Sequence, residues 1–212
     1  MADWTDSLQV FCADIGSIAR GKFAWARRIP ADAEEELHEP SSIHSLGEAV
    51  ASELKRERPV ALGFEMPLFV PVPADPEQLG KARPCDSNAP AWCSPVGANV
   101  LATGIPQVAW LLRHVHDSVP QVDLYLEWEP FAAARQGLLL WEAFVTSDAK
   151  GESDEEDATI GINAFCAQLP SPGDADANET ELPLSLGAAA GVWAGWDLPA
   201  DALRLPCIVV RA

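Results

Sequence analysis

The stretch Leu8-Gln-Val-Phe-Cys-Ala-Asp14 decides the fold, because it is a short apolar run that ends in an acidic residue. Ile15-Gly-Ser17 closes this run, and Gly21-Lys-Phe-Ala-Trp-Ala-Arg27 follows after a tight turn. Apolar runs of this length, separated by turn residues, are typical of paired strands. We therefore predict a β-hairpin near the start of the chain, with Asp14 at the end of its first strand.

Helices and strands alternate along the rest of the chain. The expected elements are an edge strand within 32–39, a helix from Ile43 to Leu54, a strand at 59–65, a helix at 105–115, a strand at 122–127, a short helix at 131–136, a strand or helix at 138–145, helices at 154–168 and 184–196, and a strand at 207–211. The Pro- and Gly-rich stretch 67–104 and the acidic stretch 170–182 are predicted to be loops. This alternation favours an α/β fold with a mixed sheet, in one domain over residues 1–212.

The composition points to a globular protein with a strong excess of negative charge. The chain has 212 residues, 48% of them apolar, and 32 acidic against 14 basic residues give a net charge of −18. Nucleic-acid binding depends on Lys and Arg that neutralise phosphates, so this charge disfavours a nucleic-acid partner unless a metal ion or a local basic patch intervenes. The cations that could form such a patch are Arg20, Lys22, Arg27, Arg28, Lys81, Arg83 and Lys150.

Membrane and secretory signals are missing from the sequence. It holds no run of 18 apolar residues, so no membrane-spanning helix is expected. The first residues lack the basic start and apolar stretch of a signal peptide. Five scattered cysteines are an odd number and do not suggest a disulfide framework. We therefore expect a cytoplasmic protein that does not associate with membranes.

Acidic residues recur where the predicted strands end. Asp14, Glu65 and Glu127 each close an apolar run, and Asp154 and Asp157 lie on one face of a predicted helix start. The carboxyl ends of strands in α/β sheets border the crevice in which ligands bind. Clustered carboxylates repel one another and need a cation, and hard oxygen ligands favour magnesium or manganese. The pattern predicts a Mg²⁺ or Mn²⁺ site, although each acid taken alone also fits a solvated strand or helix end.

Two tryptophans leave an alternative open, and several familiar motifs are absent. Trp92 in the long loop and Trp128 beside Glu127 suit either stacking on bases or packing in the core. The sequence holds no Gly-x-Ser-x-Gly elbow, Walker loop or Gly-x-Gly-x-x-Gly turn. Acyl hydrolysis by a nucleophilic serine, P-loop chemistry and dinucleotide binding therefore lose support.

Three short motifs together resemble the ribonuclease H-like superfamily. They are Phe11-Cys-Ala-Asp-Ile-Gly16 followed by a hairpin, Leu62-Gly-Phe-Glu-Met-Pro67, and Asp154-Glu-Glu-Asp157-Ala158. They look most like Holliday-junction resolvases and the bacterial predicted nucleases of unassigned function. The resemblance implies a central mixed sheet flanked by helices.

The resemblance also implies roles for the acidic residues. Asp14, Glu65 and Asp157 would be catalytic ligands of a divalent metal, and Asp154 matches the first acid of the resolvases' D-x-x-D pair. Glu127, in Leu126-Glu-Trp-Glu-Pro130, is similar to a strand-end E-x-x-P segment of the predicted nucleases.

These roles imply a metal-dependent nuclease that hydrolyses phosphodiester bonds with a metal-bound water. The alternative is an inactive relative that binds a small ligand or a protein partner through the loop 67–104, which the negative charge favours. Convergence of the three carboxylates is the feature that separates the two hypotheses.

Overall fold

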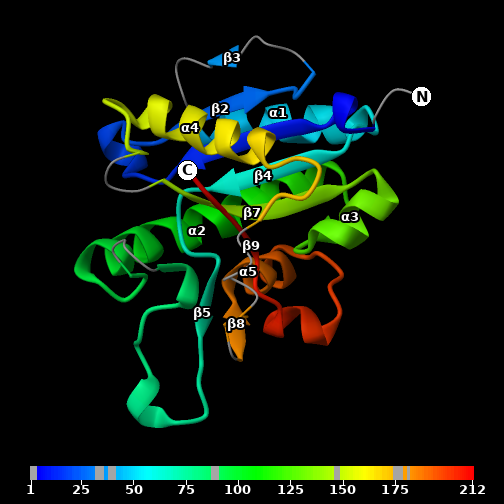
Figure 1. Cartoon of the computed structure of the whole chain (residues 1–212). Helices are drawn as coiled ribbons and strands as arrows, with labels where there is room; N and C mark the ends of the chain where they lie inside the picture. Colours follow the sequence, from blue (N-terminus) through cyan, green and yellow to red (C-terminus); the bar gives the residue numbers. More distant parts are fainter. Residues whose placement is uncertain are drawn as a thin grey trace.

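The computed structural model describes residues 4–31, 36–37, 42–86, 91–145, 149–173, 179–180 and 182–212 (Figure 1). The strands are β1 (Gln9–Asp14), β2 (Ala24–Arg28), β3 (Glu36–Leu37), β4 (Val60–Phe64), β5 (Phe69–Pro71), β6 (Leu124–Tyr125), β7 (Leu138–Phe144), β8 (Pro183–Ser185) and β9 (Ile208–Arg211). The α-helices are α1 (Ile43–Lys55), α2 (Pro95–Ser118), α3 (Trp128–Ala134), α4 (Asp154–Ala167) and α5 (Leu186–Ala194).

Seven of these strands form a mixed sheet in the order β3-β2-β1-β4-β7-β6, with β9 also paired to β7. The strands β1, β2 and β3 form an antiparallel meander, which confirms the predicted hairpin. β1, β4 and β7 are parallel neighbours, and β6 and β9 pair in parallel with the two halves of β7. The predicted α/β architecture with a central mixed sheet is therefore confirmed.

Helices cover both faces of the sheet, so its central strands are buried on both sides. Along β1, Phe11 and Ala13 pack into the apolar cluster under α1, α2 and α5, while Val10 and Cys12 pack into the cluster under α3 and α4. Figure 1 shows α4 lying across β1 and β2, with α2 and α5 below the sheet. All five residues of β4 are buried, as expected for a parallel central strand.

The helix α2 is longer than the sequence pattern predicts. The helix expected at 105–115 begins at Pro95 and ends at Ser118, so the predicted loop 67–104 is wrong over its last ten residues. The Ser94 side chain caps α2 by accepting a hydrogen bond from the Gly97 N–H, and Pro95 occupies the first turn, where proline is favoured. Prolines and glycines that looked like loop residues thus belong to a helix start.

Other expected elements differ in extent. Part of the predicted loop 67–104 forms β5, which pairs with β8 in a small antiparallel ribbon. The segment 138–145, predicted to be a strand or a helix, forms the strand β7. The strand predicted at 122–127 is shorter in the structure, where it is β6. Within the predicted acidic loop 170–182, residues 174–178 and 181 lie outside the described part of the chain.

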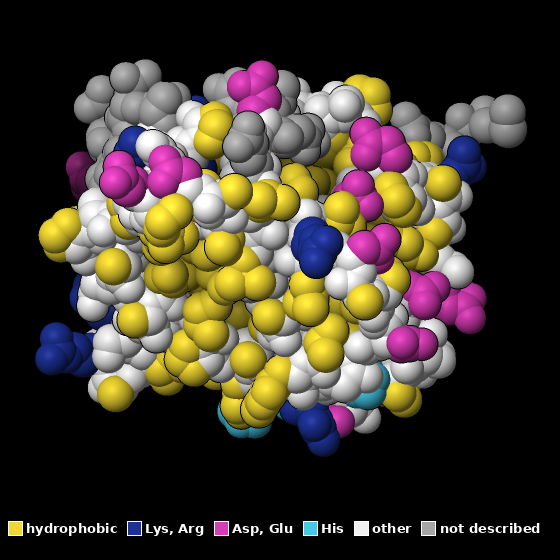
Figure 2. Space-filling view, turned by 90° about the horizontal axis from the view of Figure 1, so that it is seen from below, with side chains coloured by type: hydrophobic (Ala, Val, Ile, Leu, Met, Phe, Trp, Pro, Cys, Tyr) yellow, Lys and Arg dark blue, Asp and Glu magenta, His cyan; other side chains and the backbone are white. Residues whose placement is uncertain are grey.

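The outer surface near the β5–β8 ribbon is rich in apolar side chains. Trp193 on α5 is 66% exposed, and Leu184 in the ribbon and its neighbours Leu182 and Val72 are also exposed. Figure 2 views the molecule from the side of α5 and β8 and shows apolar side chains over much of that face, with Lys and Arg only at scattered points. None of the described helices has the length and apolar character needed to cross a bilayer.

Candidate metal centre

Two neighbouring strands and one helix bring three carboxylates to the same end of the sheet. Asp14 is the last residue of β1, and Glu65 directly follows β4. β1 and β4 run parallel in register, and the Glu65 N–H donates to the Ala13 carbonyl at 2.9 Å. Asp157 lies in the first turn of α4, which the Ser153 side chain caps through the Glu156 N–H. The strand ends and the helix start therefore meet.

The three carboxylates form a compact, partly buried cluster. One oxygen from each of Asp14, Glu65 and Asp157 lies within 4.8 Å of the other two. Asp157 is 6% exposed, and Asp14 and Glu65 are half-buried. In the described part of the chain, the buried Oε2 of Glu65 has no hydrogen-bond partner. The arrangement presents several oxygen ligands to one point.

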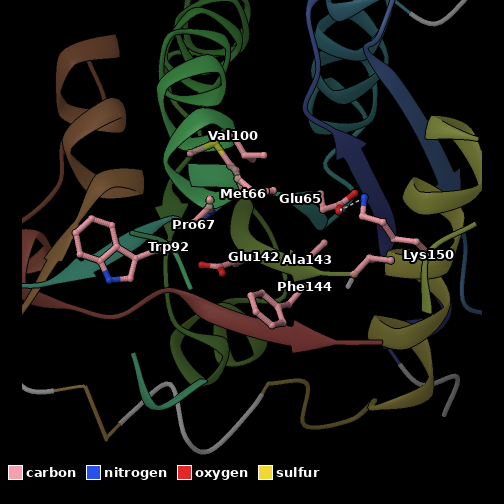
Figure 3. A pocket seen from close by; sticks show the side chains of 12 residues that line it. Glu65, Met66, Pro67, Trp92, Val100, Glu142, Ala143, Phe144 and Lys150 are labelled. Carbon is pink, nitrogen blue, oxygen red and sulfur yellow. Dashed lines mark ion pairs between the residues drawn. The ribbon is translucent and has the colours of Figure 1, made fainter. Parts of the chain in front are cut away.

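Lys150 provides the positive charge that this cluster requires. Its Nζ lies 2.9 Å from Glu65 Oε1 and 2.9 Å from Asp157 Oδ2, and Figure 3 shows it reaching Glu65 from the α4 side. The Gly151 N–H donates to Asp157 Oδ1 at 2.7 Å, which fixes that carboxylate. Burial lowers the pKa of Lys150, but the hydrogen bond to Asp157 and the charge of Glu65 outweigh it and raise this pKa. The ammonium is therefore a stable cation between two carboxylates.

Burial and mutual repulsion make two of the acids weak. Desolvation raises the pKa of Asp14 to about 6, against the opposing effects of a hydrogen bond with Glu65 and the charge of Lys150. Desolvation and then the charge of Asp14 raise the pKa of Glu65 to about 8, despite Lys150. Because protons compete with a metal for these oxygens, we expect metal affinity to increase with pH through this range.

These raised pKa values predict that stability without metal falls as pH rises. A carboxyl with a folded-state pKa above its unfolded value binds more protons in the native state, so unfolding becomes easier as pH rises from about 4.5 to about 8. At pH 8.5, Glu65→Gln should be more stable than the wild type by on the order of 2 kcal/mol. Urea denaturation at pH 5 and pH 8.5 measures this.

An exposed acid provides the control for the pH experiment. Asp117→Asn, in an exposed ion pair with Arg113, should leave the pH dependence of the wild type unchanged. If Glu65→Gln keeps the same loss of stability between pH 5 and pH 8.5 as the wild type, then Glu65 does not titrate in this range.

The other two predicted metal ligands lie outside the cluster. Asp154 is one-third exposed, and its carboxylate lies 3.5 Å from Lys22 Nζ. Its charge raises the pKa of Asp14, but its carboxylate is not one of the three that converge. Glu127 is exposed at the N-cap of α3 and lines a different pocket, together with Asp123 and Leu198. The structure thus brings together Asp14, Glu65 and Asp157 and leaves these two acids apart.

A second buried acid beside the cluster was missed by sequence reasoning. Glu142 in β7 is fully buried, and both of its oxygens accept hydrogen bonds from the Arg83 guanidinium at 2.7 and 2.8 Å. Arg83 also donates to Asp86 at 2.8 and 3.0 Å, so this arginine is a core cation and does not belong to a phosphate-binding rim. The available signal was Glu142 itself, the one charged residue of the apolar run 138–145.

The two tryptophans have different environments. Trp128 is buried and packs against Phe131 and Phe165, which makes it a core residue. Trp92 lies at the mouth of a pocket beside the cluster, and its Nε1–H donates to the Lys81 carbonyl at 2.9 Å. Of the two residues considered for base stacking, Trp92 alone keeps a surface that a ligand can reach.

Comparisons of the chain with protein-family models, with curated proteins and with solved structures find no match. A functional proposal for this chain therefore rests on the carboxylate cluster and its surroundings.

Proposed function

We propose that the chain is a metal-dependent phosphodiester hydrolase with a ribonuclease H-like fold, in which Asp14, Glu65 and Asp157 hold Mg²⁺ or Mn²⁺. The observation that carries the proposal is the convergence of the three acids within 4.8 Å at the ends of two central strands. All three donors are hard carboxylate oxygens, which suit these two cations better than softer metals.

The order of the elements supports the proposed fold. The strand that carries Asp14 lies in the sheet between an antiparallel meander on one side and the parallel strands β4 and β7 on the other. The second acid follows the neighbouring parallel strand, and the third comes from a helix packed on β1 and β2. This arrangement agrees with the first-strand, second-strand and helix positions that the resemblance implies.

The position of Lys150 supports cation binding at the cluster. Its ammonium lies 2.9 Å from an oxygen of Glu65 and 2.9 Å from an oxygen of Asp157, so these carboxylates already hold one positive charge. A divalent metal would supply the activation of a water and the stabilisation of the leaving oxygen. The Lys150 side chain is 48% exposed, so a substrate phosphate can approach it beside the carboxylates.

Competition between Lys150 and the metal gives a direct prediction. Lys150→Gln should bind Mn²⁺ about tenfold more tightly than the wild type, because a cation that opposes the metal is removed. Titration with Mn²⁺ followed by calorimetry measures the affinity. Lys81→Gln removes an equal charge from an exposed residue and should bind Mn²⁺ as the wild type does. Equal affinities in the two variants would show that Lys150 does not compete for this site.

Hydrolysis of a simple phosphodiester tests the proposed activity. The wild-type protein should release p-nitrophenolate from bis(p-nitrophenyl) phosphate with millimolar Mn²⁺ or Mg²⁺, and a chelator should stop the reaction. The same ions should raise the melting temperature, because they bind the folded state alone. A melting temperature that does not respond to either ion would contradict the proposed metal site.

A second candidate function is the binding of a small ligand without catalysis. The net charge of −18 and the apolar pocket beside the cluster favour it. In that case a ligand raises the melting temperature in the presence of a chelator, and no metal-dependent hydrolysis is found.

A further inference from the structure

A small apolar pocket adjoins the carboxylate cluster. It lies between the ends of β4 and β7 and the start of α2, with a cavity volume of about 140 Å³. Glu65 and Lys150 stand at one end, and Trp92 stands at the other (Figure 3). The remaining walls are mainly apolar, from Met66, Pro67, Val96, Val100, Phe144 and Val145. Glu142, whose carboxylate is held by Arg83, also lines the pocket, so the recess is mainly apolar but carries charged groups at the Glu65–Lys150 end and on the β7 wall.

The volume and the walls of this pocket fit one planar ring. An apolar cavity of about 150 Å³ holds a benzene molecule in another protein, so about 140 Å³ accommodates a single six-membered ring. Trp92 is fixed by its hydrogen bond to the Lys81 carbonyl, and the Arg211 guanidinium lies 5.0 Å from the Phe144 ring centre. Aromatic walls held in place favour a flat π-system over a flexible aliphatic chain.

We propose that this pocket binds one pyrimidine base of the substrate, beside the phosphodiester that the carboxylates act upon. This inference rests on the proposed function. Glu65 belongs both to the pocket wall and to the cluster, and its partner Lys150 also lines the pocket, so a base in the pocket places its own sugar and phosphate next to the metal ligands. The ring then positions the scissile bond, which raises the effective concentration of the reacting groups.

The charges of the chain favour a short substrate over a long nucleic acid. A polymer needs a row of cations along its phosphates, and the net charge here is −18. Several basic residues that the sequence offered for such a row are engaged by side-chain partners, namely Arg83 by Asp86 and Glu142, Arg27 by Glu53, Arg28 by Asn163 and Lys22 by Asp154. A mononucleotide ester or a short oligonucleotide therefore fits better than a duplex.

Two sugar phosphates that differ only in the base test this proposal. With Mn²⁺ present, thymidine 5′-monophosphate should bind at least about tenfold more tightly than 2-deoxyribose 5-phosphate, measured by calorimetry. Val100→Trp fills the pocket and should remove this preference while Mn²⁺ binding persists. Val96→Trp, at a 63% exposed position of the pocket wall, serves the same purpose with less risk to folding. Val72→Trp, at an exposed position away from the pocket, should keep the preference.

The outcomes separate this proposal from the proposed function. Equal binding of the two sugar phosphates to the wild type, or a preference that both Val100→Trp and Val96→Trp retain, would overturn the base pocket. If Mn²⁺ still raises the melting temperature in that case, the proposed metal site remains supported and only the base pocket is contradicted. A preference for thymidine 5′-monophosphate without any response to Mn²⁺ would support base binding in the pocket and contradict the proposed metal-dependent hydrolase.

Discussion

Asp14→Asn is expected to abolish the metal-dependent rise in melting temperature and to lower hydrolysis of bis(p-nitrophenyl) phosphate by about 100-fold or more. The substitution keeps the shape of the side chain but replaces a charged oxygen of the cluster with an amide. Loss of a supporting group around a metal typically costs about 10–100-fold, and a direct ligand should cost at least as much. Thermal melts with and without Mn²⁺, together with initial rates, measure both effects.

The same variant should not be destabilised in the absence of metal. Burial and neighbouring acids raise the pKa of Asp14 to about 6, so its charged form is unfavourable in the folded protein above that pH. A neutral amide removes this cost, and the metal-free melting temperature at pH 8 should be at least that of the wild type. This separates a lost metal ligand from a general loss of folding.

Glu127→Gln is the matched control for Asp14→Asn. It also removes one negative charge, but at an exposed position outside the cluster. Its response to Mn²⁺ and its rate should equal those of the wild type. A metal-dependent rise that persists in Asp14→Asn, or that disappears in Glu127→Gln, would show that the ligands are assigned to the wrong acids.

The acids at strand ends could be predicted from local patterns in the sequence, but only the resemblance singled out the three that meet. Asp14 and Glu65 each close an apolar run, which is a local pattern. Glu127 has the same pattern, yet its strand pairs with the start of β7, with Tyr125 opposite Leu139. Glu65 follows a strand that extends to Glu142 of β7. Strand register is a non-local property, so the local pattern alone could not tell which strand ends lie side by side.

The secondary structure was predictable where the hydrophobic periodicity was clear, and the prediction failed where a helix start resembled a turn. The buried runs of β1 and β4 and the capped start of α4 carry clear local signals, whereas the run that forms β7 left strand and helix open. The first half of α2 contains Pro95, Gly97 and Gly104, residues that weaken a helical pattern. Packing overrides that weakness, because Gly104 lies against Met66 and Ile15, where a larger side chain would collide. Such tertiary contacts are invisible in a single sequence.

The partners of the charged residue Arg83 could not be predicted from the sequence either. In the sequence it is one of several cations in a polar stretch, and nothing local distinguishes it from Lys81. In the structure its side chain is fully buried and bridges two acids that come from β7 and from the turn before α2. The partner Glu142 lies 59 positions along the chain, so their pairing could not be deduced without the fold.

Arg83→Met is expected to lower the free energy of unfolding by about 3–5 kcal/mol, because it leaves Asp86 and Glu142 buried without their counterion. The side chains of all three residues are at most 1% exposed, so water cannot replace the lost guanidinium. For a chain of this length, that loss corresponds to a fall in melting temperature of roughly 10 °C. Urea denaturation and a thermal melt measure the two quantities.

Neutralising the two carboxylates that Arg83→Met leaves unpaired should restore much of the free energy of unfolding. The triple variant Arg83→Met, Asp86→Asn, Glu142→Gln no longer buries an unpaired charge, and the new side-chain amide keeps an oxygen for the Leu68 N–H that now donates to Glu142 at 2.9 Å. Arg113→Met, which breaks an exposed ion pair with Asp117, should cost less than about 1 kcal/mol. If Arg83→Met is as stable as Arg113→Met, then the buried ion pairs of Arg83 do not support the fold.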